Sequence, residues 1–153
     1  MGLRVNLTFL PTTQSDADVL VNIRIEAMRE SLERAGRFDP KRARDRFLAS
    51  FDSALCRFIE VDGVRVGFVL VRPRQDHWLL DHLYVVPEHQ GKGIGAAVLR
   101  HIFADADEHR VSIRVGALRG SESNRFYQRH GFTQTDEAEW DIYYLRPPSF
   151  RDE

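Results

Sequence analysis

Three glycines in five residues stand between two apolar segments in DHLYVVPEHQGKGIGAAVL, the stretch from Asp81 to Leu99. Glycine lets the backbone approach a ligand closely or adopt a positive φ. Amides at the start of a helix have no helical acceptor, and the helix dipole there favours negative charge. Gly91, Gly93 and Gly95 therefore predict a strand, loop and helix junction that binds a phosphate group. A tight turn without a ligand is the alternative.

The glycine spacing alone leaves the ligand open. GKGIGA matches the G-x-G-x-x-A dinucleotide fingerprint, but that fingerprint usually lies early in a βαβ unit, and several expected strands precede this loop. The segment does not match the GxxxxGK[ST] nucleotide loop. A dinucleotide-binding domain therefore remains as an alternative.

Composition favours one globular domain over residues 1–153. The chain is 42% hydrophobic and 29% charged with a net charge of −1, which gives no basic excess for binding nucleic acid. No apolar run approaches the roughly 20 residues needed to cross a membrane. The single cysteine, Cys56, lies in the apolar stretch LCRFIEV, which predicts a buried structural thiol. Absence of a signal-peptide pattern in MGLRVNLTFL and the low cysteine content favour a cytoplasmic protein.

Hydrophobic periodicity predicts the elements that position this loop. Helices are expected from about Ser15 to Gly36, from Pro40 with Asp39 as its cap, from Gly91 to about Glu108, and from a Ser121 cap to Arg129. Phe47, Leu48 and Phe51 are expected to face the core. Strands are expected at residues 3–9, 54–61, 64–72, 78–86, 111–115, 132–135 and 140–146. Because helices and strands interleave without strict alternation, a mixed sheet with helices on both faces is expected.

The loop resembles a specific family pattern. Gln90-Gly91-Lys92-Gly93-Ile94-Gly95 fits the Q/R-x-x-G-x-G/A motif of the GCN5-related N-acetyltransferase (GNAT) superfamily, and LYVVPEH fits the strand and bulge that precede it. About 30 residues later, Asn124-Arg125-Phe126-Tyr127 with His130-Gly131-Phe132 resembles the second motif, N-x-x-Y followed by G-F. The order of elements also matches. The resemblance implies the GNAT fold, a mostly antiparallel twisted sheet of about seven strands with about four helices.

The resemblance further implies that acetyl-coenzyme A donates an acetyl group to a primary amine of a small molecule or peptide, by direct attack in a ternary complex and without a metal. The diphosphate would bind the amides of the loop, and the pantetheine arm would pair with the preceding strand. The amide of Val85 would polarise the thioester carbonyl. The implied coenzyme-binding residues are Leu83, Tyr84, Val85, Gln90, Gly91, Lys92, Gly93, Ile94, Gly95, Ala96 and Asn124.

Asp81 is the leading candidate for the base, because an amine acceptor with a pKa of ~10 must lose a proton before it attacks. Aspartate is disfavoured inside strands, and a buried carboxylate would suit base catalysis. Some family members carry a carboxylate at the matching position. An aspartate that bonds a neighbouring loop or pairs with an arginine is the alternative. His82 points to the opposite strand face and is the weaker candidate.

Tyr127 is expected to protonate the departing thiolate, as the matching family tyrosine does. Phe126 is expected to serve as the aromatic anchor of that helix, which leaves Tyr127 for the site. The alternative is a noncatalytic acyl-coenzyme A sensor or interaction module, which would keep the fold but would have lost turnover. Formation of a homodimer is a further expectation by analogy.

The acceptor is not specified by the sequence. An arginine-rich stretch could attract an acidic substrate, although pairing with nearby acidic residues is the default explanation; it contains Arg24, Arg29, Arg34, Arg37, Arg42, Arg44 and Arg46. Acidic residues near the final hairpin could attract a cationic amine or be solvated: Asp136, Glu137, Glu139 and Asp141. Four aromatic residues could line the acceptor cleft or pack in the core: Trp78, Trp140, Tyr143 and Tyr144.

Overall fold

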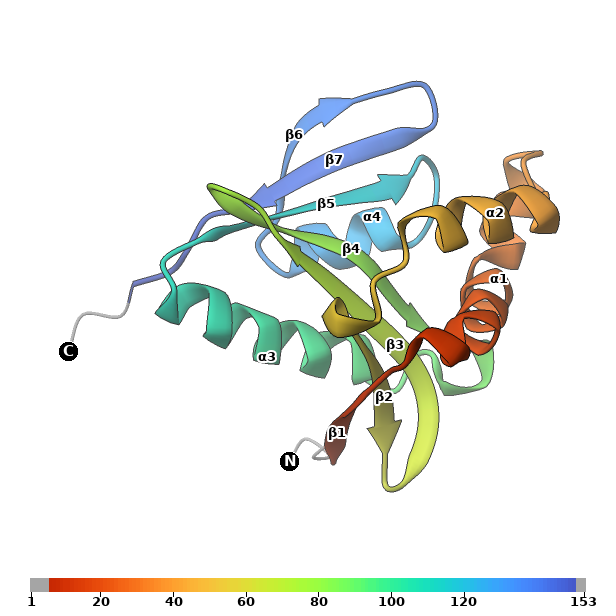
Figure 1. Cartoon of the computed structure of the whole chain (residues 1–153). Helices are drawn as coiled ribbons and strands as arrows, with labels where there is room; N and C mark the ends of the chain where they lie inside the picture. Colours follow the sequence, from red (N-terminus) through yellow and green to blue (C-terminus); the bar gives the residue numbers. More distant parts are fainter. Residues whose placement is uncertain (1–5, 151–153) are drawn as a thin grey trace. The chain divides into compact units, whose positions relative to one another are not determined.

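The computed structural model describes residues 6–150, and Figure 1 shows their helices and strands. The strands are β1 (Leu7–Pro11), β2 (Cys56–Val61), β3 (Val64–Pro73), β4 (His77–Val85), β5 (Ser112–Leu118), β6 (Thr133–Glu137) and β7 (Asp141–Arg146). The α-helices are α1 (Ala17–Arg34), α2 (Pro40–Ser50), α3 (Ile94–Glu108) and α4 (Ser123–Arg129). Short 3₁₀ helices lie at Gln14–Asp16, Ser53–Leu55 and Pro87–His89.

The strands described here form one hydrogen-bonded sheet in the order β1-β2-β3-β4-β5-β7-β6. β4 and β5 pair in parallel, whereas β1–β2, β2–β3, β5–β7 and β6–β7 pair antiparallel. The parallel pair requires a crossover connection, which α3 supplies. The mixed, mostly antiparallel sheet that the sequence predicts is therefore confirmed.

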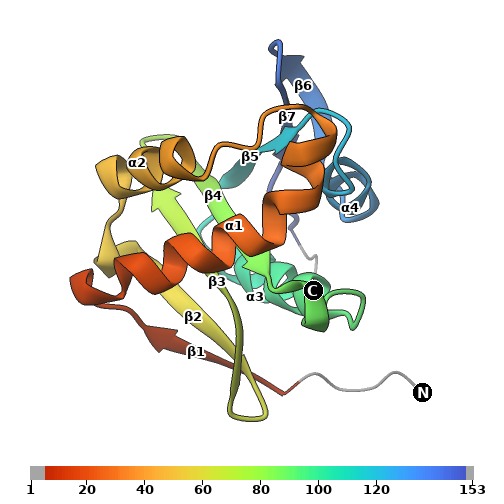
Figure 2. The ribbon, with the colours of Figure 1, turned by 90° about the vertical axis from the view of Figure 1, so that its right-hand side faces the viewer.

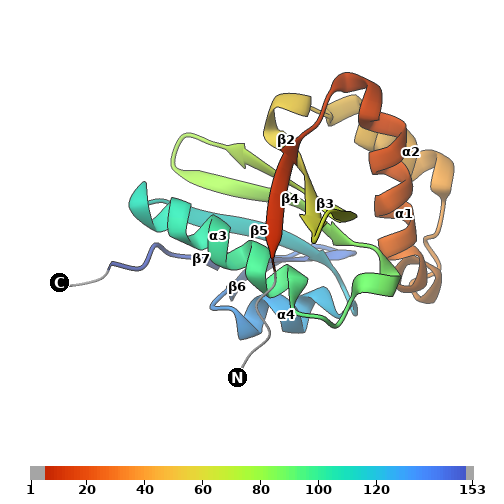
Figure 3. The same cartoon turned by 90° about the horizontal axis from the view of Figure 1, so that it is seen from below.

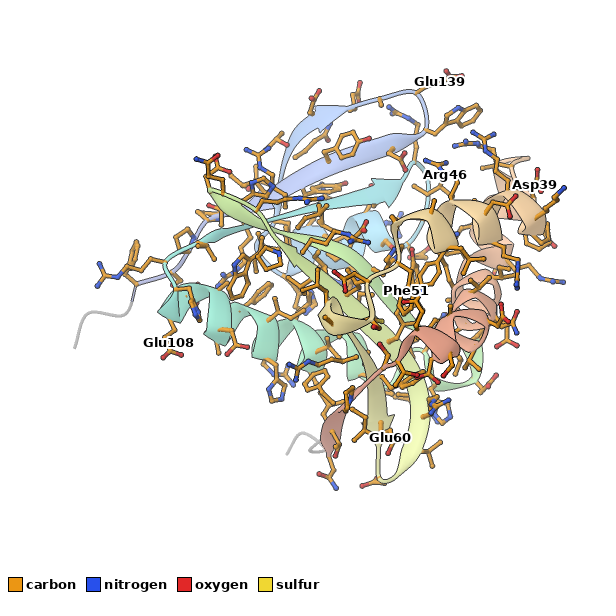
Figure 4. All side chains as sticks on the ribbon, in the orientation of Figure 1. Asp39, Arg46, Phe51, Glu60, Glu108 and Glu139 are labelled. Atoms are coloured by element: carbon orange, nitrogen blue, oxygen red, sulfur yellow. The ribbon has the colours of Figure 1, made fainter. Side chains whose placement is uncertain are left out.

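Local sequence signals explain most element boundaries. The β2–β3 hairpin turns at Asp62 and Gly63, both at positive φ (51° and 80°), as the Asp-Gly pair predicts. The Asp39 side chain accepts a hydrogen bond from the backbone nitrogen of Arg42 at 3.2 Å and caps α2, and Figure 4 labels Asp39 at the start of that helix. Gly36, at φ +69°, follows the end of α1.

Several predicted boundaries were wrong or fell partly outside the described part. α3 begins at Ile94 rather than Gly91, because Gly91 and Gly93 adopt positive φ. The N-cap of α4 is Glu122, which makes no side-chain cap, and the predicted cap Ser121 lies one residue earlier. Within the first predicted strand, residues 3–5 lie outside the described residues, and β1 runs on to Pro11.

Residues 6–70 and 82–97 group into one compact unit, called the first unit below. Figure 2 shows α1 and α2 lying over its strands. Its buried core cluster is Leu20, Val21, Ile23, Phe47, Cys56, Phe58, Phe68, Leu70 and Val86. Phe47 and Phe51 pack inward as predicted, and Cys56 is fully buried. Leu48 is 37% exposed, contrary to expectation, because Phe47 is the residue that α2 buries and Phe51, which packs on the core, follows the end of that helix.

Residues 71–81 and 98–150 group into the second unit. β5, β7 and β6 lie side by side in it (Figure 1). Arg146 at the end of β7 donates to both carboxylate oxygens of Asp107 at 2.8 and 3.1 Å, and its guanidinium lies 3.9 Å from the ring centroid of Phe103. The backbone nitrogen of Ser149 donates to the same carboxylate. These contacts fasten the segment after β7 to α3.

None of the helices within residues 6–150 is long and apolar enough to cross a membrane. In the same range, no group of three or more His, Cys, Asp or Glu side chains is placed to hold a metal ion.

Candidate functional site

The glycine loop belongs to the first unit and joins β4 to α3. Gly91 and Gly93 adopt φ of +77° and +81°, a conformation that side chains disfavour, and a Cβ at either would meet no atom within 4 Å. Figure 3 shows the green segment after β4 turning back before α3 starts. The first helical hydrogen bond runs from the Ala97 nitrogen to the Gly93 carbonyl, 3.1 Å. The amides of residues 94–96 thus precede the first helical donor and suit an anion.

Gln90 closes this loop onto the strand before it. Its Nε2 donates to the backbone oxygen of Val85 at 2.8 Å. The side-chain amide therefore fixes the distance between the end of β4 and the loop. Any contact of Gln90 with a coenzyme would come from its backbone or from the second hydrogen of the amide.

The end of β4 lies unusually close to β3, through a residue that the sequence analysis passed over. A Cβ placed on Gly67 would stand 1.9 Å from the carbonyl oxygen of Tyr84. Two residues after Tyr84, just past the end of β4, the Val86 nitrogen donates to the Val66 oxygen at 2.9 Å. Only glycine fits at position 67. A glycine inside the strand pattern VRVGFVLV was the available sequence signal for this close approach.

The parallel register of β4 with β5 covers only the first part of β4. It runs from His77↔Ser112 to Leu80↔Val115 within the described residues. β5 continues to Leu118 and pairs with β7 from Ile113 to Leu118. Beyond Leu80, the backbone of β4 thus lies outside the register that pairs β4 with β5.

Asp81 lies on β4 in the second unit and forms an ion pair. The Nε of Arg72 on β3 donates to its Oδ2 at 2.7 Å, and the side chains of Arg72 and Asp81 are 13% and 30% exposed. Pairing with an arginine was the alternative to a base role for Asp81. The ion pair does not remove the base role, because a carboxylate has further acceptor positions.

His82 and Tyr84 lie in the first unit on the face of β4 that α1 and α2 cover. The His82 ring contacts the rings of Phe47 and Phe68 at centroid distances of 5.1 and 6.0 Å. Its Nδ1 is 3.4 Å from the hydroxyl oxygen of Tyr84. The two residues share one face, as strand alternation predicts.

Asn124 at the start of α4 has its side chain engaged within the second unit. Its Nδ2 donates to the backbone oxygens of Leu118 and Ser121 at 2.9 and 3.0 Å, and its Oδ1 accepts from the Tyr144 hydroxyl at 2.7 Å. The asparagine therefore ties α4 to β5 and β7. Burial raises the pKa of Tyr144 above its usual 10, so this hydroxyl keeps its proton at neutral pH.

Tyr127 is the buried residue of α4, only 6% exposed. Its ring contacts Phe126 and Phe132 at centroid distances of 5.3 Å and Tyr144 at 6.5 Å. The expectation that Phe126 anchors the helix was wrong: Tyr127 is the residue most deeply packed, and Phe126 is only partly buried.

The aromatic residues and arginines that could bind the acceptor differ in burial. Tyr144 is 2% exposed and packs in the core, whereas Trp140 and Tyr143 are 41% and 40% exposed. In the arginine-rich stretch, Arg44 pairs with Asp18 at 2.6 Å, across α1 and α2. By contrast, the buried Nε of Arg24 on α1 has no hydrogen-bond partner within residues 6–150.

Comparison with known proteins agrees with this geometry. The family model described as an acetyltransferase (GNAT) domain matches residues 52–134. A GCN5-like protein acetyltransferase of Mycobacterium tuberculosis is 32% identical over 74 residues, 45% of this chain and 36% of the relative. The match thus spans only about a third of that relative's length.

Solved structures show the same fold. A PaiA N-acetyltransferase of Thermoplasma acidophilum, in complex with coenzyme A, aligns with a TM-score of 0.75 at 17% identity over 93% of this chain and 99% of that one. The ribosomal-protein-S18-alanine N-acetyltransferase of Escherichia coli aligns with a TM-score of 0.70 at 18% identity over 96% and 97%. The sheet and helices are thus those of the GNAT fold, as predicted. The family match over residues 52–134, which include both motifs, places this chain in the GNAT acetyltransferase family.

Proposed function

We propose that the chain is an acetyl-coenzyme A-dependent N-acetyltransferase that acetylates a primary amine of a small molecule or peptide within a ternary complex. The loop carries this proposal: Gly91 and Gly93 at positive φ present the first amides of α3 without side chains in the way. The coenzyme A bound to the T. acidophilum neighbour supports the donor. Loop residues 91–96 are the proposed site for the diphosphate, with Lys92 contributing charge.

Backbone groups of Leu83, Tyr84 and Val85 are the proposed partners of the pantetheine arm, since the β4–β5 register ends at Leu80. The Val85 amide would donate to the thioester carbonyl oxygen. Asn124 stays a proposed coenzyme contact. The Asn124 side chain already bonds Leu118 and Tyr144. Asn124 would therefore contact the coenzyme through its backbone, or act by positioning the start of α4.

Acetyl-coenzyme A supplies an activated thioester. In the transfer, the acceptor nitrogen forms the new C–N bond, the C–S bond breaks, the nitrogen loses a proton and the sulfur gains one. Asp81 is the proposed acceptor of the first proton and Tyr127 the proposed donor of the second. Arg72, which bonds the Oδ2 of Asp81, would hold that carboxylate in place.

A binding screen followed by a turnover assay tests the proposal. Thermal shift should show stabilisation by acetyl-coenzyme A and none by NAD(P) or ATP. Thiol release should then require an added primary amine. Stabilisation by NAD(P) alone would overturn the assignment in favour of a dinucleotide-binding domain. Stabilisation by acetyl-coenzyme A without thiol release across a broad amine panel would instead identify an acyl-coenzyme A sensor.

We also propose that residues 1–153 act as a single GNAT domain. Equilibrium unfolding followed by far-UV circular dichroism and by tryptophan fluorescence should then give one coincident transition. Two separated transitions would contradict this proposal.

A further inference from the structure

Within the described part of the chain, Arg24 on α1 carries a buried polar atom that its neighbours do not satisfy. Arg24 follows the buried Leu20 and Val21 by one helical turn, so it lies on the face of α1 that packs on the sheet of the first unit. Its Nε is buried and makes no hydrogen bond within residues 6–150. Buried polar groups in proteins are nearly always hydrogen-bonded, so each exception requires an explanation.

The Arg24 guanidinium contacts an aromatic ring. Its guanidinium carbon lies 5.9 Å from the centroid of the Tyr84 ring, at the outer limit of a cation–π contact. The Tyr84 hydroxyl faces His82, and the His82 ring packs against Phe47. Tyr84, His82 and Phe47 thus form an aromatic patch beside Arg24. A partly buried guanidinium in such a place gains most from an anion that accepts two of its donors.

Two arginines nearby in the sequence show the two usual environments of a guanidinium, an ion pair and exposure to water. Arg44 pairs with Asp18. Arg29, five residues after Arg24 on α1, lies 4.8 Å over the ring of Phe38 and is exposed, so water satisfies it. Arg24 has neither the ion pair of Arg44 nor the exposure of Arg29. Its environment therefore differs from that of a solvated surface arginine.

We propose that Arg24 binds a carboxylate of the acetyl acceptor, so that the preferred acceptors are amino acids or similar amines that carry a carboxylate near the amine. This inference rests on the proposed acetyl transfer and specifies its substrate class. Tyr84 places the cluster on β4 next to Val85, the proposed contact of the thioester carbonyl. A small molecule bound by Arg24 would thus stand beside the strand along which the thioester is proposed to lie.

The coenzyme is the competing source of an anion. Its diphosphate already has a proposed site on residues 91–96, at the start of α3, whereas Arg24 lies on α1 and contacts the face of β4 that carries His82 and Tyr84. We therefore assign Arg24 to the acceptor. The assignment requires that removal of its charge leaves acetyl-coenzyme A affinity unchanged.

The test compares L-amino acids with the corresponding α-carboxamides, as acceptors in a thiol-release assay with rates expressed per unprotonated amine. The full-length wild-type chain should prefer the carboxylates by roughly 10- to 100-fold in kcat/KM, the range for a hydrogen bond to a charged group. Arg24→Gln should reduce this ratio to about one, and Arg24→Lys should retain part of it. Arg29→Gln, the matched control on the same helix, should keep the wild-type ratio.

Each other outcome is equally decisive. A wild-type chain that acetylates carboxamides as well as carboxylates overturns the inference without any variant, and leaves the proposed acetyl transfer intact. Loss of acetyl-coenzyme A affinity in Arg24→Gln also overturns it and assigns Arg24 to the coenzyme.

A binding readout separates failure of this inference from failure of the acetyl transfer. If no amine releases thiol, thermal shift of the coenzyme A complex with an amino acid and with its carboxamide still tests Arg24. Stronger stabilisation by the amino acid in wild type, absent in Arg24→Gln, supports the inference, and equal stabilisation in wild type overturns it.

Discussion

Arg72 on β3 holds Asp81 on β4 through a 2.7 Å bond from Nε to Oδ2, with both side chains largely shielded from solvent. The same carboxylate is the proposed base. A positioned ion pair and a base are compatible, and the two roles predict different effects of substitution.

Asp81→Asn keeps the shape of the side chain and an oxygen that can accept from Arg72, but it cannot accept the proton of an ammonium. We expect kcat/KM to fall by roughly 100- to 10,000-fold at neutral pH, the usual contribution of a general base. The measurement is thiol release over a range of pH, and the loss should shrink at high pH, where the amine is already unprotonated.

Asp107→Asn is the matched control, because Asp107 forms a similarly shielded ion pair with Arg146 in the same unit. Both substitutions should lower the free energy of unfolding by about 1–3 kcal/mol. Only Asp81→Asn should lower turnover beyond what the stability loss explains. Equal activity of the two variants would leave Asp81 with the purely structural role.

Gly67→Ala should be strongly destabilising, because its Cβ would lie 1.9 Å from the Tyr84 carbonyl oxygen and backbone cannot move aside easily. We expect a loss of about 1–3 kcal/mol or more in the free energy of unfolding, measured by urea denaturation. Gly116→Ala is the control: its Cβ would meet only the Tyr143 side chain at 3.1 Å, and that exposed ring can shift. A mild effect of Gly67→Ala would contradict the close approach of β3 and β4.

Gly91→Ala should weaken acetyl-coenzyme A binding. The new side chain meets no atom of the protein within 4 Å, so its effects are the strain of a positive φ, about 1–2 kcal/mol, and obstruction of the loop surface. Gly63→Ala in the β2–β3 turn has nearly the same φ and the same open surroundings. Isothermal titration should therefore show reduced affinity for Gly91→Ala alone. If both variants bind the coenzyme equally well, the loop is a turn without a ligand.

Tyr127→Phe should lower kcat while leaving acetyl-coenzyme A affinity unchanged, if its hydroxyl donates the proton to the departing thiolate. A thiol-release assay measures kcat, and isothermal titration with acetyl-coenzyme A measures the affinity separately. Unchanged kcat would reduce Tyr127 to the aromatic anchor that its 6% exposure describes.

Tyr144→Phe affects folding rather than turnover, because it removes the 2.7 Å bond to Asn124. We expect a cost of about 0.5–1.5 kcal/mol at neutral pH. The raised pKa of Tyr144 means that its contribution is complete below pH 10 and is lost as the pH rises through the folded-state pKa. Stability of the wild-type chain should thus decline more steeply above pH 10 than that of Tyr144→Phe, in urea denaturation at several alkaline pH values.

Periodicity and turn chemistry were sufficient for most of the fold. Asp62-Gly63 determined the hairpin, and Asp39-Pro40 determined the start of α2, because both act through local backbone preferences. The strand order was not accessible from these signals. That β7 lies between β5 and β6 depends on long-range pairing, which a local pattern does not encode.

The candidate site shows the same division. The glycine loop is a local feature, and the sequence located it together with the start of a helix. The partner of Asp81 was not predicted, since Arg72 lies on another strand and nothing in its neighbours distinguishes it from the other arginines. Arg24 was one of seven arginines in one stretch, and what separates it from the rest is its buried Nε, which has no hydrogen-bond partner within residues 6–150.

Cys56 has 0% of its surface exposed, and it is the only cysteine in the sequence. A thiol-reactive chromophore should therefore leave the folded protein unlabelled and report released coenzyme A without background. The same reagent becomes a reporter of denaturation, because its reaction with this sulfur requires the core beneath α1 and α2 to open.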